Sequence, residues 1–70
     1  MVAYHVRAVW DADGGVYWSE SNVPGLNVEA ETLAGFVDLV ESLAPDLLRD
    51  NGRPPAPVTI VGETVLKAAS

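Results

Sequence analysis

The 70-residue sequence predicts one α+β domain, residues 1–70, in which three antiparallel strands, one helix and a fourth strand follow one another (β-β-β-α-β). Three observations carry this prediction. Apolar and polar residues alternate over residues 2–11, an acidic turn with two glycines follows at residues 11–15, and residues 33–48 place apolar side chains at the helical period of about 3.6. The fourth strand then returns beside the first and parallel to it, through a right-handed crossover.

The first two strands form a hairpin. Residues 2–11 present a wholly apolar face made of Val2, Tyr4, Val6, Ala8 and Trp10, and a mixed face on the other side. In the turn, the aspartates bond their own backbone and the glycines supply positive φ. Residues 16–21 form the return strand.

Side-chain chemistry selects the register of this hairpin. The expected cross-strand pairs are Trp10–Tyr17, Val9–Trp18, Ala8–Ser19 and Arg7–Glu20. These pairs join aromatic with aromatic, small with small, and opposite charges, which favours the register. A slip of one residue would set Val6 opposite Glu20 and is therefore rejected.

Breaker residues divide the rest of the chain. Pro24 ends the ladder within residues 22–25, so residues 26–30 are expected to be a short edge strand. Thr32 is the expected N-cap of the helix, without a capping box because Gly35 takes the place of Glu or Gln. Pro45 either kinks this helix or ends it, and residues 51–52 form a stop signal. The expected buried stripe is Leu33, Phe36, Val37, Val40, Leu43, Ala44, Leu47 and Leu48.

The last segment completes the sheet. Residues 53–57 hold three prolines and are irregular, and residues 58–67 form the final strand, with a bulge at Gly62. A single helix covers one face of the sheet and leaves the other open. Large apolar residues on an uncovered face indicate an interaction surface. The predicted partner-binding residues are Trp18, Val9, His5, Arg7 and Glu20. The alternative is that the 53–57 loop or a bulged strand covers them.

Composition narrows the classes of function. The chain has no cysteine, one histidine and a net charge of −6, and 49% of its residues are apolar. The acidic charge disfavours direct binding of nucleic acid. The high apolar content of so short a chain favours contact with another chain, either a second copy, with a homodimer favoured, or a different protein. No signal peptide or membrane-spanning segment is visible, so a cytoplasmic location is expected.

The residues that could support catalysis do not converge, so we expect neither an enzyme nor a metal or cofactor site. Asp11 and Asp13 belong to a turn, Glu20 pairs with Arg7, and the helix acids face solvent. His5 lies on the open face without a serine or cysteine beside it. The glycine-containing segments match neither a phosphate loop nor a calcium loop.

The order of these parts resembles a known family. Ala8 to Asp11, Asp13 to Tyr17, Val23 to Leu26 and Glu29 to Leu33 resemble the N-terminal domain of HicB-type antitoxins. The Trp10-Asp11 pair, the Glu29-Ala30 segment, and residues 45–48 followed by 51–52 look more specifically like its stand-alone relatives, the domain-of-unknown-function family numbered nineteen-oh-two. The resemblance covers about 50 residues, and the order and spacing of its motifs carry it.

This resemblance implies a truncated ribonuclease-H-like fold without catalytic acids. It also implies a module that binds and occludes a small basic RNase toxin of the HicA type. HicB antitoxins usually carry a C-terminal DNA-binding segment that this sequence lacks, so promoter binding is not carried over. The alternative function is a self-associating structural or regulatory protein without a toxin partner.

Overall fold

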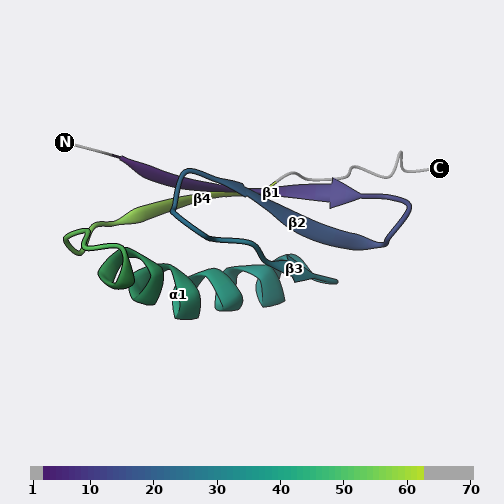
Figure 1. Ribbon diagram of the computed structural model, residues 1–70. Coiled ribbons are helices and arrows are strands. Elements are labelled where there is room, and N and C mark those ends of the chain that lie inside the picture. Colours follow the sequence, from purple (N-terminus) through teal and green to yellow (C-terminus); the bar gives the residue numbers. More distant parts are fainter. Residues whose placement is uncertain (1–2, 63–70) are drawn as a thin grey trace.

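A computed structural model describes residues 3–62, which form one four-stranded sheet and one helix. The elements are β1 (Tyr4–Asp11), β2 (Val16–Ser21), β3 (Glu29–Ala30), α1 (Leu33–Asp50) and β4 (Val58–Gly62). The strand order is β3-β2-β1-β4, with β1 antiparallel to β2 and parallel to β4. The helix α1 runs along one face of the sheet (Figure 1). The α+β class, the order of elements and the parallel fourth strand are confirmed.

The β1–β2 hairpin has the predicted register, with Trp10 opposite Tyr17 and Val9 opposite Trp18. In the turn, a carboxylate oxygen of Asp11 accepts hydrogen bonds from the backbone N–H groups of Asp13 at 3.0 Å and Gly14 at 3.2 Å. Of the two turn glycines, Gly15 alone has a positive φ, +67°. The turn is therefore held by one aspartate and one left-handed residue, where the sequence predicts two of each.

The third strand is shorter than predicted, because residues 29–30 alone pair with β2 in a regular ladder. Residue Val28 instead exchanges hydrogen bonds with the backbone and hydroxyl of Ser19, at 3.1 and 2.9 Å. The side chain of Val28 is buried, as is that of Val23 in the preceding turn. Because these two valines pack in the core beside α1, residues 23–28 lie closer to the helix than a regular edge strand would and do not form a ladder with β2.

The helix α1 is continuous through Pro45, which is exposed. The sequence left open whether Pro45 kinks the helix or ends it, and the prediction that it ends the helix is wrong. Thr32 is the N-cap, and its hydroxyl accepts a bond from the Gly35 N–H at 3.0 Å. At the other end, Gly52 has a φ of +69° and donates to the carbonyl of Arg49, while the next N–H donates to Leu48. This is the Schellman pattern that the stop signal predicts.

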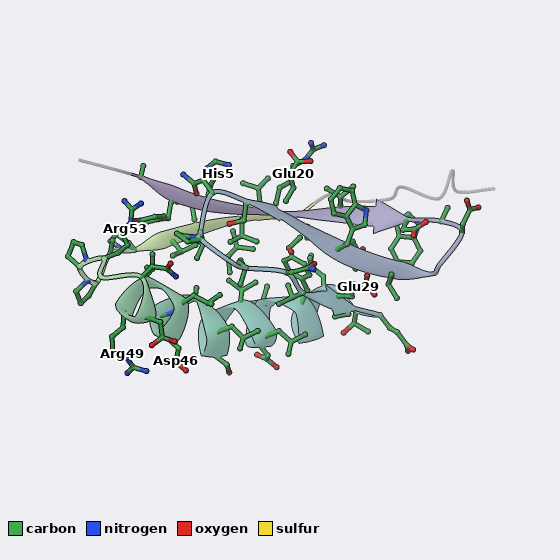
Figure 2. All side chains as sticks on the ribbon, viewed as in Figure 1. His5, Glu20, Glu29, Asp46, Arg49 and Arg53 are labelled. Atoms are coloured by element: carbon green, nitrogen blue, oxygen red, sulfur yellow. The ribbon has the colours of Figure 1, made fainter. Side chains whose placement is uncertain are left out.

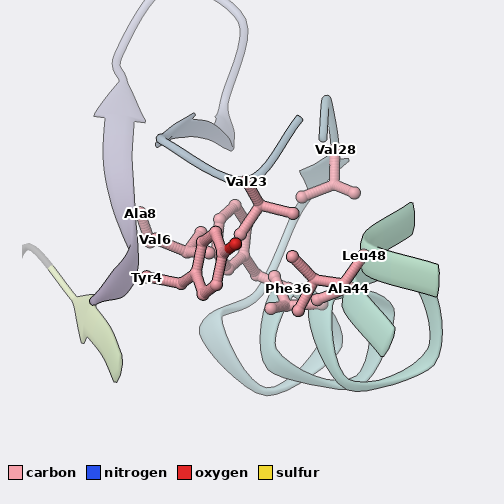
Figure 3. Close-up of a cluster of buried hydrophobic side chains, with 9 residues drawn as sticks. Tyr4, Val6, Ala8, Val23, Val28, Phe36, Ala44 and Leu48 are labelled. Carbon is pink, nitrogen blue, oxygen red and sulfur yellow. The ribbon is translucent and has the colours of Figure 1, made fainter. Parts of the chain in front are cut away.

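The hydrophobic core lies between α1 and the inner face of the sheet (Figure 3). It consists of Tyr4, Val6, Ala8, Val23, Val28, Phe36, Val40, Ala44 and Leu48. The predicted apolar face of β1 is confirmed for Tyr4, Val6 and Ala8, whereas Trp10 is half-buried beside Tyr17 and is not part of the core. The predicted helix stripe is too wide, because Leu33 and Leu43 are 36% and 39% exposed. The sequence pattern also misses Val23 and Val28, since each stands alone in a turn-rich segment.

The predicted bulge at Gly62 is wrong. The parallel register runs without interruption from Tyr4 opposite Val58 to Ala8 opposite Gly62. A Cβ atom at Gly62 would lie 3.0 Å from a methyl group of Leu33, so glycine here permits close approach of the helix to the strand. Val2 and residues 63–67, which the sequence assigns to the first and last strands, lie outside the described residues. Within residues 3–62, no helix has the length and apolar character to cross a membrane.

Candidate protein-binding face

The surface of the sheet opposite α1 is formed by His5, Arg7 and Val9 of β1, Trp18 and Glu20 of β2, and Val61 of β4; we call it the open face. The register sets these residues side by side, because each is the cross-strand partner or the same-face neighbour of another. In Figure 2, the side chains of His5 and Glu20 project from the sheet on the side away from α1. The structure thus brings all five predicted partner-binding residues onto one surface.

The centre of the open face is apolar. Trp18 is 39% exposed, and Val9 lies half-buried next to it. Val61, which is 52% exposed, lies on the edge strand β4 opposite Arg7. No element within residues 3–62 covers these side chains. The 53–57 loop, which is the alternative cover, lies instead beside α1, where Ala56 packs against the core. A tryptophan in this position offers a large contact area at a low cost in side-chain entropy.

Charged groups lie beside this apolar centre. Arg7 stands opposite Glu20 across the β1–β2 ladder, and Glu29 of β3 stands opposite Trp18 on the other side of β2. The face therefore has a cationic strand next to an anionic one. Such a pattern fixes how a partner is oriented more than how tightly it binds.

Polar side chains outside the predicted site link β1 to the segment that follows β2. The backbone N–H of His5 donates to the side-chain oxygen of Asn22 at 2.9 Å, and its carbonyl accepts from the Ser21 hydroxyl at 2.7 Å. The Asn22 amide also donates to the carbonyl of Ala3 at 2.8 Å. These bonds continue the β1–β2 pairing where the Pro24 turn interrupts it. The polar run before Pro-Gly is the sequence signal that could have identified them.

The described residues hold no group of three or more histidine, cysteine, aspartate or glutamate side chains that could bind a metal ion. One oxygen of the Asp11 carboxylate already accepts two backbone N–H groups of its own turn. The open face consists of apolar contact area and charged groups, the two components of which protein interfaces are generally made.

A second feature is a hollow of about 380 Å³ between α1 and β4. Its lining is mostly apolar and includes Pro45, Leu48, Pro55, Ala56 and Val58, with Arg49 and Arg53 as its charged members. The lining contains no buried polar or charged side chain, so nothing in it would orient a ligand.

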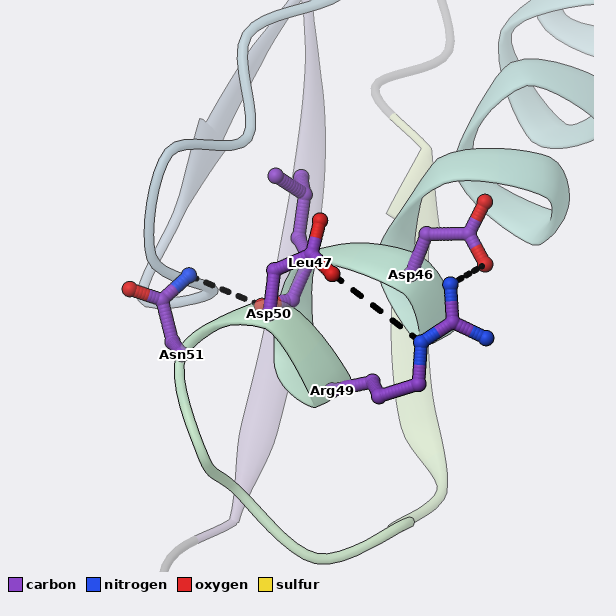
Figure 4. Close-up of polar contacts among 5 residues, drawn as sticks. All are labelled: Asp46, Leu47, Arg49, Asp50 and Asn51. Atoms are coloured by element: carbon purple, nitrogen blue, oxygen red, sulfur yellow. Dashed lines mark hydrogen bonds and ion pairs between the residues drawn. The ribbon is translucent and has the colours of Figure 1, made fainter.

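The arginine on the helix side of this hollow is engaged with its own helix (Figure 4). Arg49 contacts Asp46 at 3.1 Å and Asp50 at 3.9 Å, with well over half of each side chain in solvent. Beside it, the Asn51 amide donates to the Leu47 carbonyl at 2.8 Å. Exposed pairs of this kind add little stability. They complete the end of α1, and the open face remains the better candidate for a binding site.

Two comparisons with known proteins each match nearly the whole chain. The chain is similar to the crystal structure of hypothetical protein TTHA1013 from the extremely thermophilic bacterium Thermus thermophilus, with a TM-score of 0.74 and 34% sequence identity. The match covers 99% of this chain and 100% of that one. A family model also matches residues 3–68. Among curated proteins, none matches.

Proposed function

The chain belongs to the family described as Domain of unknown function (DUF1902), and we propose that it is a non-catalytic, HicB-like protein-binding module of the cytoplasm. Its partner would be a small basic RNase toxin of the HicA type, which it would bind and occlude. In this proposal the four-stranded sheet with one helix is a truncated ribonuclease-H-like fold that has kept the sheet surface and lost the catalytic acids.

One observation carries the proposal: Trp18 and Val9 lie together on a sheet face that no described element covers. Exposed aromatic side chains with apolar neighbours are typical energetic centres of protein interfaces. The partner's charge follows from the composition, since ten acidic residues stand against four basic ones. An acidic protein attracts a basic partner and accelerates their encounter.

The test is a binding titration with a small basic RNase encoded next to this protein. We expect Trp18→Ala to weaken binding about 30-fold or more, as is usual for a tryptophan at the centre of an interface. The matched control is Leu39→Ala, because Leu39 is also 39% exposed but lies on α1. The control should bind like the wild type and should still block RNA cleavage by the toxin.

A charge substitution on the open face provides a second test, in which the rate of association is measured. Glu20→Lys should slow association, and added salt should reduce the difference from the wild type. If Trp18→Ala and Leu39→Ala bind the toxin equally well, the open face is not the binding surface. If no small basic RNase binds the wild-type protein, the antitoxin function itself is wrong.

A further inference from the structure

The open face is complementary to itself. Two cross-strand pairs lie on its two central strands, Val9 with Trp18 and Arg7 with Glu20, one residue of each pair on β1 and the other on β2. A two-fold axis that runs parallel to the strands, between β1 and β2, exchanges these two strands when a second copy is placed face to face. It therefore sets every residue of a pair against the complementary residue of the other copy.

We propose that the open face binds a second copy of this chain, as a two-fold dimer of stacked sheets. In this arrangement Val9 lies against the partner's Trp18, and Arg7 lies against the partner's Glu20, each contact occurring twice. Stacked sheets are separated by about 10 Å, a distance that facing Arg and Glu side chains span. The proposal does not depend on the antitoxin function.

Charge selects this axis over the alternative. A two-fold axis across the strands would lay β1 over the partner's β1. Depending on where the axis crosses, Arg7 would then face the partner's His5, Arg7, Val9 or Asp11. Of these only Asp11 is anionic, and one oxygen of its carboxylate already accepts two backbone N–H groups of its own turn. The axis along the strands instead gives two contacts between opposite charges, side by side, next to a cluster of two tryptophans and two valines.

The size of the face indicates a weak, exchangeable dimer. Four strands about 4.8 Å apart, with 8, 6, 2 and 5 residues, give a flat area of roughly 300 Å² per copy. A stable interface buries about 800 Å² per partner, so we expect dissociation at concentrations of about 10–100 μM. A dimer of this strength protects Trp18 at high concentration and leaves the face accessible to a competing partner.

Mixing two charge variants tests the contact between copies. Arg7→Glu alone would bring Glu against the partner's Glu20, and Glu20→Arg alone would bring Arg against the partner's Arg7, so neither variant should self-associate. When the two variants are mixed, every facing pair is again of opposite charge. Wild-type protein and the equimolar mixture should both show the dimer mass in sedimentation equilibrium at about 300 μM, well above the expected Kd. Each variant alone should show the monomer mass.

The controls separate a dimer contact from an effect within one chain. Arg7 and Glu20 are both exposed, so circular dichroism should show each variant folded. No effect inside a single chain can restore a mass when two variants are mixed. A further reading comes from Trp10→Phe, which leaves Trp18 as the single tryptophan and should show a red shift of emission on dilution. Leu39→Ala should dimerise like the wild type.

Three results would overturn the proposal. They are a monomer mass for the wild type across the whole concentration range, a dimer mass for either charge variant alone, and a monomer mass for the mixture. None of them bears on toxin binding, because no other protein is present. Conversely, a toxin that fails to bind leaves the mixing experiment unchanged.

Discussion

Two leucine-to-alanine substitutions on α1 test how the core is arranged. Leu48 is 2% exposed and Leu43 is 39% exposed, although the helical period predicts both to be buried. Both changes remove the same atoms from the same helix, and Leu and Ala have similar helix propensity. Any difference in their effect on the free energy of unfolding therefore reports tertiary burial alone.

The expected magnitudes follow from the surroundings of each residue. A buried Leu→Ala change costs about 2–5 kcal/mol. Leu48 lines the hollow of about 380 Å³ beside β4, so its truncation enlarges a space that solvent reaches and should cost about 2–3 kcal/mol. Leu43→Ala loses part of the transfer free energy and leaves no closed cavity, which amounts to about 1 kcal/mol or less.

Urea denaturation, followed by circular dichroism at low protein concentration, measures both variants. A domain of this size has a net stability of about 3–5 kcal/mol, and its unfolding free energy falls by about 1 kcal/mol per molar urea. The midpoint should therefore fall by about 2–3 M for Leu48→Ala and by about 1 M or less for Leu43→Ala. Equal shifts for the two variants would refute the assignment of Leu43 to the exposed flank of the helix.

Three further predictions concern the ends of elements, each measured as a change in the urea midpoint. Thr32→Ala should cost about 1 kcal/mol because the Gly35 N–H loses its acceptor, whereas Thr32→Ser should stay near the wild type; an equal loss for both would contradict the capping role. Gly52→Ala should cost about 1 kcal/mol or more, since its φ is +69°, and Gly52→Asn should cost less. Asp11→Ala should destabilise the hairpin by about 1 kcal/mol through loss of two backbone acceptor bonds, while Asp13→Ala, which leaves both of those bonds in place, should leave the midpoint almost unchanged.

Local rules in the sequence determined much of this fold. Alternation over β1, the pairing of Trp10 with Tyr17, the Thr32 cap and the 51–52 stop all depend on interactions between residues close in sequence or directly across a hairpin. Such interactions have a fixed period or a fixed offset, and a single sequence therefore reveals them. The same rules placed the five residues of the candidate site on one face, because side chains alternate strictly along a strand.

Tertiary structure alone decided the rest. The width of the buried helix stripe depends on how far the sheet extends beneath α1, and so Leu43 is exposed while Leu48 is buried. Val23 and Val28, one on each side of Pro24, enter the core because this segment packs against α1, and no periodic pattern in the sequence indicates it. Gly62 accommodates Leu33 from the far end of α1, a close approach that is invisible until the helix is docked. Contacts between elements distant in sequence have no fixed offset, and for that physical reason they appear only in the folded molecule.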